Sequence, residues 1–228
     1  MAKKIIRWAV ALFFGSTILA VVAYRFIPVY ITPLMVIRMA EQARDGRSLT
    51  MHHRWVSLGQ MSPHIMRAVI AAEDAKFMSH HGFDYEAIEK AAEHNRNSTD
   101  GQTLGASTIT QQTAKNVFLW PGRTYVRKGL EAYFTFLMET LWGKERIMEV
   151  YLNSIEMGDG IYGVEAVARE HFGCGAGELT IEQCALIAAS LPNPLRHNSA
   201  APDDYLLKRQ RKILRGMAFV TDIPGGDR

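Results

Sequence analysis

The sequence predicts a mainly α-helical protein with a single apolar helix at its N-terminus. Residues 8–24 contain no charged side chain. Apolar residues recur at helical spacing along most of the remaining chain, and hardly any segment alternates as a half-buried strand does. With 228 residues, of which 48% are hydrophobic, the chain is long enough to bury a core.

The uncharged segment WAVALFFGSTILAVVAY is near the lower length limit for a helix that crosses about 30 Å of hydrocarbon. Lys3, Lys4 and Arg7 precede it, so the positive-inside rule keeps the N-terminus in the cytoplasm and exports the body. A cleaved signal peptide that ends near Ala23 is the alternative. Apolar and aromatic residues that continue past the segment favour a retained anchor.

Charge and cysteine content narrow the class of protein further. The net charge of +3 is too small to indicate a nucleic-acid partner. Export would place Cys174 and Cys184 in an oxidising compartment, where a disulfide can form. Two cysteines do not make a disulfide framework, and we predict two free thiols, with a disulfide as the alternative.

No continuous helix is predicted at the start of the exported body. Pro28 and Pro33 interrupt any helix that continues from the anchor, and residues 38–47 have the composition of a polar linker. A helix then begins with Ser62 at the N-cap and Pro63 at the first helical position. Further helices are predicted, from their apolar periodicity and capping boxes, over 83–95, 108–119, 126–142, 144–153 and 180–191.

Two adjacent carboxylates, Glu73 and Asp74, come at the end of the helix that Pro63 begins. An acidic pair at a helix end is most often solvated. Acids at a helix C-terminus nevertheless oppose the macrodipole, at a cost of a few tenths to about 1 kcal/mol. Because Phe77 follows closely, a carboxylate here is also a candidate general base with a raised pKa.

A second candidate group combines Glu131 with four cations. Arg127 and Lys128 precede Glu131 on one predicted helix, an order of charges that stabilises a helix poorly. Together with Lys115 and Arg123 they form a basic series on both sides of a loop. This series is either a solvated basic face or a binding site for a phosphorylated group.

Several other chemistries lack their sequence patterns. The chain contains no GxxxxGK[ST] phosphate loop, no HExxH zinc motif and no GxSxG nucleophile motif. Two carboxylates, a polar segment and a basic series suit glycosyl transfer from a lipid-linked sugar diphosphate. A base would remove a proton from the acceptor hydroxyl, and the cations would stabilise the departing pyrophosphate.

Five motifs in order along the chain resemble those of the family 51 peptidoglycan glycosyltransferases. They are EDAKFMSHHG, GASTITQQTAK, RKGLE, KERIMEVYLN, and VAREHFG followed by LTIEQCALIAASLPNP. The resemblance extends from about Trp55 to Phe219. Within the family, the chain resembles the monofunctional biosynthetic type. It implies a lysozyme-like helical lobe and a smaller membrane-associated lobe behind one transmembrane helix. The implied domains are 1–27 (cytoplasmic tip and anchor), 28–54 (membrane-proximal linker) and 55–228 (transferase).

The resemblance also implies a reaction and a location. The growing glycan on undecaprenyl pyrophosphate is the donor, and the 4-hydroxyl of lipid II is the acceptor. Attack inverts the anomeric carbon and forms a β-1,4 link. The implied location is the bacterial inner membrane, in a single pass, with the catalytic domain facing the periplasm and other cell-wall synthesis proteins as candidate partners.

Residue roles follow from the same resemblance. Glu73 is the implied general base, and Glu131 lies near the donor pyrophosphate, where it either assists departure or holds Mg²⁺ or Mn²⁺. No organic cofactor is implied. Many family members carry arginine where this chain has Lys76, so a bidentate contact there becomes a point contact. The implied substrate-binding residues are Lys76, Ser107, Thr108, Gln111, Gln112, Lys115, Arg123, Arg127, Lys128 and Asn153.

Two alternatives from other classes remain at this stage. A lysozyme-like hydrolase of the same polymer would also use a carboxylate, but it would not need the basic series, because no pyrophosphate leaves. An inactive membrane-tethered scaffold would need neither Glu73 nor Glu131, and both carboxylates are present.

Overall fold

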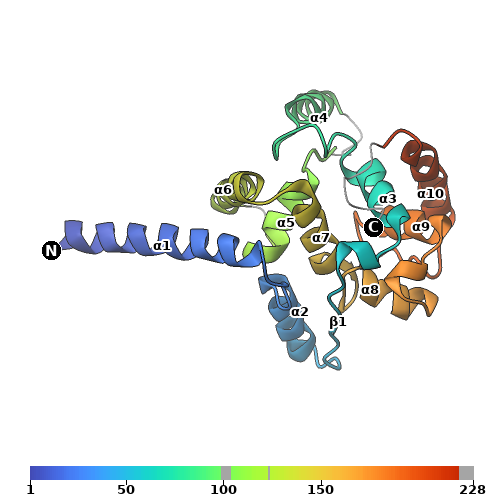
Figure 1. Cartoon of the computed structure of the whole chain (residues 1–228), viewed down its shortest axis with the longest axis horizontal. Helices are drawn as coiled ribbons and strands as arrows, with labels where there is room; N and C mark the ends of the chain where they lie inside the picture. The colour runs from blue at the N-terminus through green and yellow to red at the C-terminus, as the bar shows by residue number, and fades with distance from the viewer. Residues whose placement is uncertain (99–103, 123, 221–228) are drawn as a thin grey trace.

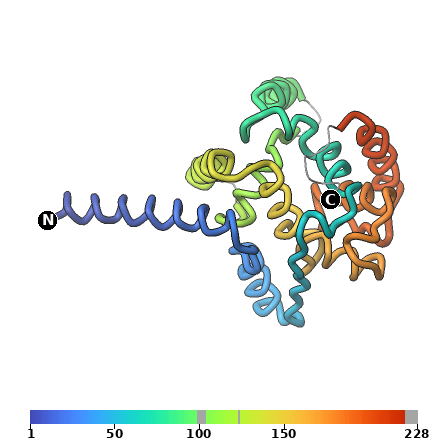
Figure 2. The backbone as a smooth tube through the Cα atoms, in the orientation of Figure 1, coloured from blue at the N-terminus to red at the C-terminus, as the bar shows by residue number. Residues whose placement is uncertain are grey.

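A computed structural model describes residues 1–98, 104–122 and 124–220, and this part of the chain is mainly helical (Figures 1 and 2). Its α-helices are α1 (Ala2–Tyr24), α2 (Pro33–Arg44), α3 (Pro63–Glu73), α4 (Tyr85–Asn97), α5 (Ile109–Phe118), α6 (Tyr125–Leu141), α7 (Lys144–Ser154), α8 (Val164–Val167), α9 (Ile181–Ser190) and α10 (Asp204–Met217).

Strands are few and short among the described residues. The sheet has the order β1-β3-β2, where β1 (His52–His53) runs parallel to β3 (Ile161–Tyr162), and β2 (Glu156–Gly158) runs antiparallel to it. A π-helical turn over Ala168–Phe172 and 3₁₀ turns over Leu58–Gln60 and Ala176–Glu178 complete the elements. The prediction of a mainly α-helical body is confirmed.

Local capping explains where several helices begin. Thr108 and Gln111 form the predicted capping box at the start of α5, and Thr180 and Gln183 form the one at the start of α9. Ser62 occupies the N-cap of α3 as predicted, although its side chain makes no capping hydrogen bond. The helix predicted over 83–95 is displaced by about two residues, since α4 begins after its N-cap Asp84.

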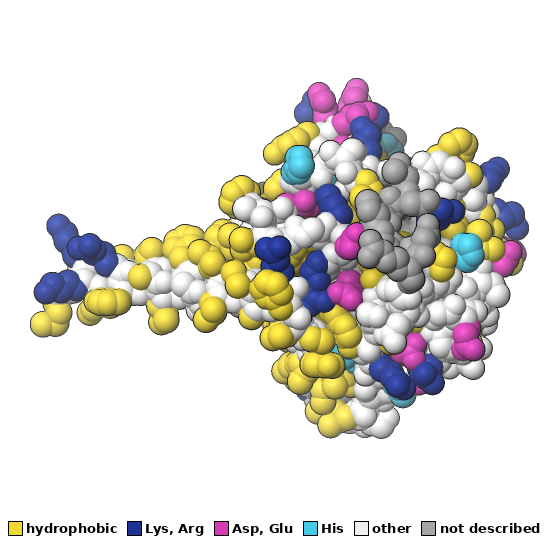
Figure 3. Space-filling view, in the orientation of Figure 1, with side chains coloured by type: hydrophobic (Ala, Val, Ile, Leu, Met, Phe, Trp, Pro, Cys, Tyr) yellow, Lys and Arg dark blue, Asp and Glu magenta, His cyan; other side chains and the backbone are white. Residues whose placement is uncertain are grey.

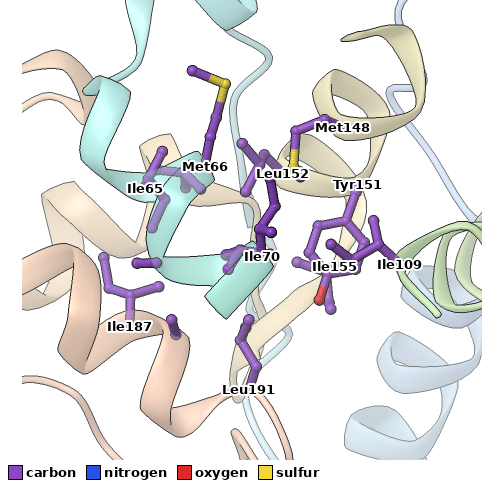
Figure 4. Close-up of a cluster of buried hydrophobic side chains, with 14 of the residues drawn as sticks. Ile65, Met66, Ile70, Ile109, Met148, Tyr151, Leu152, Ile155, Ile187 and Leu191 are labelled. Carbon is purple, nitrogen blue, oxygen red and sulfur yellow. The ribbon is translucent and has the colours of Figure 1, made fainter. Parts of the chain in front are cut away.

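The core joins two groups of helices. Helices α3, α9 and α10 pack together, and α5 packs on both α6 and α7. Figure 4 shows where the groups meet: Ile70 of α3, Ile109 of α5 and Leu152 of α7 lie in one buried cluster with Ile187 of α9. The C-terminal end of α3 therefore lies between the two groups, and the candidate base Glu73 ends this helix.

The predicted linker over residues 38–47 is wrong for its first part, because α2 is helical up to Arg44. Thr32 caps α2 by accepting a hydrogen bond from the backbone N–H of Met35, and Pro33 is the first residue of the helix. Leu34 and Met35 are buried. Tertiary packing, which composition does not reveal, makes this polar segment a helix.

Helix α1 is long and apolar enough to span a membrane, and it projects from the body as an exposed apolar rod (Figures 1 and 3). Its last turns are held by the body. The indole N–H of Trp142 donates to the carbonyl oxygen of Val21 at 2.8 Å, and the Arg146 guanidinium donates to that of Tyr24 at 2.8 and 3.0 Å. The body thus pairs the Tyr24 carbonyl, which the helix C-terminus leaves free, and gives the Val21 carbonyl a second donor besides the backbone N–H of Arg25.

The two cysteines are free, as predicted. Cys184 is buried in α9, and Cys174 is half-buried in the turn after the π-helical segment. Burial raises the pKa of Cys184 to about 12, so this thiol is an unreactive core group.

Candidate active site

The two motifs EDAKFMSHHG and GASTITQQTAK meet at the carboxylate of Asp74. This side chain is 3% exposed, and its Oδ2 accepts the backbone N–H of Ile109, the first residue of α5, at 3.0 Å. The imidazole Nε2 of His80 lies 2.9 Å from both carboxylate oxygens. Asp74 therefore joins the C-terminus of α3 to the N-terminus of α5, where an anion is favoured.

A second contact strengthens this junction. The hydroxyl of Thr108, the N-cap of α5, donates to the carbonyl oxygen of Gly82 at 2.7 Å. Gly82 has a φ of +89°, and a Cβ at this position would lie 2.7 Å from Cγ2 of Thr135. The motif therefore requires glycine here, both for the backbone conformation and for the close approach of α6.

The junction places Glu73 beside Gln112. The side-chain amide of Gln112 donates to Oε2 of Glu73 at 2.9 Å, and the hydroxyl of Tyr151 donates to Oε1 of Gln112 at 3.2 Å. Because the Gln112 oxygen accepts from Tyr151, its NH₂ group must face Glu73. Burial raises the pKa of Tyr151, so its hydroxyl stays neutral and remains a donor.

Glu73 has the electrostatic environment of a general base. Its side chain is only 13% exposed, and burial raises its pKa above the ordinary value of 4.5. The hydrogen bond from Gln112 and the positive charges of Arg209 and Lys115 oppose that rise. The carboxylate is thus a stronger base than an exposed one, while nearby donors and cations favour its ionised form.

A cavity of about 510 Å³ begins at Gln112, one hydrogen bond from Glu73. Its size suits a sugar with a pyrophosphate. Helices α2, α5 and α6 contribute to it, together with the segment after α9. Its described lining is Leu34, Arg38, Ser107, Gln112, Lys115, Asn116, Leu119, Trp120, Pro121, Gly122, Arg127, Lys128, Glu131, Ile155, Glu156, Leu191, Pro192 and Pro194.

Glu131 lies in the cavity wall as a buried carboxylate bound to two cations of its own helix. Its Oε2 accepts from Arg127 at 2.6 Å, and its Oε1 accepts from Lys128. Arg127 is buried beside it, whereas the Lys128 side chain is half exposed. Both oxygens of this buried carboxylate therefore already accept hydrogen bonds.

Lys115 of α5 lines the same cavity and forms no ion pair with a carboxylate among the described residues. Surrounding protein lowers the pKa of this lysine; Glu131 opposes the effect, and the like charges of Arg127 and Lys128 add to it. Glu131 offsets one of the three positive charges of Lys115, Arg127 and Lys128, so this part of the wall keeps a net positive charge that an anion would stabilise. The cavity is accordingly suited to a phosphorylated group.

The structure brings together six of the residues that the sequence singled out and places others elsewhere. Ser107, Gln112, Lys115, Arg127, Lys128 and Glu131 line the cavity. Thr108 and Gln111 are buried in the capping box of α5 and support the site from behind. Arg123 lies outside the described residues.

Lys76 and Asn153 lie away from the cavity lining. Lys76 is exposed and forms an ion pair with Glu86 of α4. The side chain of Asn153 is fully buried, where it accepts from the backbone N–H of Val56 and donates to the carbonyl oxygens of Val56 and Glu149. These contacts give Asn153 a structural part in holding the segment before α3.

Sequence reasoning did not find Arg38 and Glu156, which also line the cavity. Nε and Nη2 of Arg38 donate to Oε1 and Oε2 of Glu156 at 2.8 and 3.2 Å, and Nη1 donates to Glu41 at 2.8 Å. Arg38 belongs to α2, which composition had assigned to a linker. The pair is separated by 118 residues, so no local pattern predicts it.

The chain is similar to known proteins over most of its length. The chain matches the transglycosylase family over residues 42–218. It is also similar to three proteins named biosynthetic peptidoglycan transglycosylase. That of Bacteroides thetaiotaomicron is 59% identical, over 97% of this chain and 90% of the relative. Those of Caulobacter vibrioides (57% identical, over 87% and 83%) and Bdellovibrio bacteriovorus (53% identical, over 95% and 86%) follow. The similarity therefore includes both motifs that meet at Asp74.

The junction makes a prediction for Asp74→Asn. This substitution keeps the shape of the side chain but removes the charge that the N-terminus of α5 and His80 stabilise. The free energy of unfolding should fall by about 1–3 kcal/mol, measured by denaturant titration. Asp45→Asn, at an exposed aspartate after α2, is the control and should leave stability unchanged. An equally stable Asp74→Asn protein would show that the junction does not depend on this charge.

Proposed function

This chain belongs to the transglycosylase family, and on that premise we propose that it polymerises lipid II into β-1,4-linked glycan strands for the bacterial cell wall. The family's lysozyme-like helical domain agrees with the helices described above. The observation that carries the proposal is the largely buried Glu73 beside a cationic cavity of about 510 Å³. A base and a pyrophosphate site are the two parts that the reaction needs.

The proposed reaction assigns one role to each side of the site. The acceptor hydroxyl oxygen attacks the anomeric carbon of the donor, and Glu73 takes the hydroxyl proton. The new C–O bond forms as the bond between the anomeric carbon and the phosphate oxygen breaks, and the electron pair leaves with undecaprenyl pyrophosphate. Attack opposite the leaving group inverts the carbon. Lys115, Arg127 and Lys128 stabilise the charge on the pyrophosphate.

The cavity lining also separates this function from hydrolysis of the same polymer. A hydrolase transfers the sugar to water without releasing pyrophosphate, so it gains nothing from cations at this wall. The described lining contains Arg38, Lys115, Arg127 and Lys128. Purified protein should therefore make long glycan from labelled lipid II and should not fragment preformed glycan.

The part played by a divalent cation is a separate proposal. Both oxygens of Glu131 accept hydrogen bonds from cations, and the described residues contain no group of three metal-binding side chains. This arrangement does not fit a resident metal ion. We propose that Mg²⁺ or Mn²⁺, where the reaction uses it, enters with the pyrophosphate.

We also propose that α1 crosses the inner membrane with the body on the periplasmic side. Lys3, Lys4 and Arg7 are at its exposed N-terminal end, in agreement with the positive-inside rule. Helix α6 contacts this anchor and carries exposed apolar side chains, among them Tyr125 and Val126, as expected at a membrane surface.

The orientation predicts the outcome of a protease experiment. Protease added to spheroplasts should digest the body from Arg38 onward, while a cytoplasmic marker protein in the same cells stays intact. A body that is protected as well as the marker would overturn the proposed topology.

Glu73→Gln tests the base. Glutamine keeps the hydrogen-bonding reach of Glu73 but cannot accept the proton, so polymerisation should fall roughly 10²–10⁴-fold. Because burial raises the pKa of Glu73, its ionised form destabilises the folded wild-type protein at pH values above that pKa. The uncharged glutamine removes this cost, so the variant should melt no lower than wild type at neutral pH. Glu182→Gln, at an exposed position on α9, is the control. Near-normal glycan synthesis by Glu73→Gln would transfer the role to another group.

Lys115→Ala tests the cationic wall. The loss of a charge-assisted hydrogen bond should weaken binding of a phosphoglycolipid, moenomycin-like donor-site inhibitor by roughly 1.5–3 kcal/mol, measured by calorimetry. Lys212→Ala, which removes an exposed lysine from α10, should bind the inhibitor as wild type does. Equal affinity in the two variants would make Lys115 an ordinary surface cation.

A further inference from the structure

The two oxygens of the Glu73 carboxylate have different surroundings. Oε2 accepts the hydrogen bond from Gln112. Oε1 faces the guanidinium group of Arg209 in α10, and Nη2 of Arg209 lies 3.9 Å from it. This distance is about 1 Å longer than a hydrogen bond. Among the described residues, Oε1 therefore accepts no hydrogen bond, so it is the oxygen of Glu73 left for a substrate hydroxyl, with Arg209 beside it.

Arg209 differs from the other cations of α10. Lys208, Arg211 and Lys212 are exposed, whereas Arg209 is half-buried where α10 packs against α3 (Figure 1). Its Nε is buried and has no hydrogen-bond partner among the described residues. A buried N–H group without a partner is costly in a folded protein and calls for a physical explanation.

The geometry of the guanidinium group suggests what the unpaired Nε–H of Arg209 could bind. Nε–H and one N–H of Nη2 lie on the same edge of the plane and point in the same direction, as a two-donor fork. In this structure Nη2 is the nitrogen near Glu73, and Nε is the unpaired one. A group with two neighbouring oxygens can therefore bind to the fork while one of these oxygens contacts Glu73.

We propose that Arg209 is an acceptor-positioning residue, which binds two neighbouring oxygens of the acceptor sugar and directs the attacking hydroxyl to Oε1 of Glu73. This inference rests on the proposed function. The fork donates to the hydroxyl oxygen and to the adjacent sugar oxygen. Glu73 takes the hydroxyl proton as the hydroxyl oxygen bonds to the donor carbon, and Arg209 keeps its charge throughout.

The same arrangement has an electrostatic consequence. The charged or titratable groups that act on Glu73 are Arg209 from α10, Lys115 from α5 and the adjacent Asp74, and the neutral hydroxyl of Tyr151 from α7 lies nearby. Arg209 lowers the pKa of Glu73, in opposition to the effect of burial. Removal of the Arg209 charge should raise that pKa, so activity should be lost at a higher pH as the solution is acidified.

The test measures extension of a saturating preformed glycan donor at increasing concentrations of lipid II as acceptor. Arg209→Gln removes the charge and the fork, Arg209→Lys keeps only the charge, and Arg211→Gln is the matched control on an exposed position of the same helix. Melting temperature and binding of the donor-site inhibitor are measured for each variant.

We expect Arg209→Gln to raise the KM for the acceptor roughly 10- to 100-fold and to shift the acid limb of the pH profile to higher pH. Inhibitor binding should be unchanged. Arg209→Lys should restore the pH profile but not the acceptor KM, a separation that a purely structural role would not produce. Arg211→Gln should behave as wild type.

Three results would overturn the inference: an Arg209→Gln enzyme equal to Arg211→Gln, an acceptor defect matched by an equal loss of inhibitor affinity, or a defect explained by a lower melting temperature. A wild-type protein that makes no glycan from lipid II would overturn the proposed function and this inference together. An active wild type with an unaltered Arg209→Gln variant would overturn only the role of Arg209.

Discussion

The site depends on the buried carboxylate of Asp74. This group has a position that helix electrostatics disfavours, after the C-terminus of α3, and its environment is favourable because the N-terminus of α5 lies against it. Its hydrogen bond to the N–H of Ile109 joins two segments that are 35 residues apart in the sequence. Removal of this bond would leave the first turn of α5 with a buried donor unpaired, so the two helices are constrained to meet here.

Everything close to the reacting groups follows from that junction. Glu73 precedes Asp74, and Gln112 lies one helical turn beyond Ile109, so joining the helices brings the carboxylate and the amide within 2.9 Å. Tyr151 then fixes which way the amide points. The result is a base that is buried enough to bind a proton well yet supplied with donors that stabilise its ionised form. These requirements oppose each other, and the balance is set by side chains from three helices.

The sequence predicted the parts of this arrangement that depend on local chemistry. Capping boxes located the starts of α5 and α9, and the unfavourable position of Glu73 and Asp74 at a helix end marked them as unusual. Contacts between distant segments were not predictable. Arg38 meets Glu156 across 118 residues, and Arg209 reaches Glu73 from a helix whose basic face resembles an ordinary solvated one. Asn153 is the opposite case. Its motif suggested a contact with the substrate, whereas its buried side chain donates hydrogen bonds to the backbone carbonyl oxygens of Val56 and Glu149.

The docking of α1 connects the membrane to the chemistry. The hydroxyl groups of Thr17 and Tyr133 lie 2.9 Å apart, so α1 contacts α6 along the helix that also carries Arg127, Lys128 and Glu131. With α1 across the bilayer, as proposed, this packing would fix the height of the cationic wall relative to the lipid surface. A lipid-linked pyrophosphate is confined to that same height, because its chain stays in the hydrocarbon and its charges stay in water. In the proposed arrangement, the packing of α1 on α6 would hold the cations at the height of the leaving group, so the substrate would not need to leave the membrane.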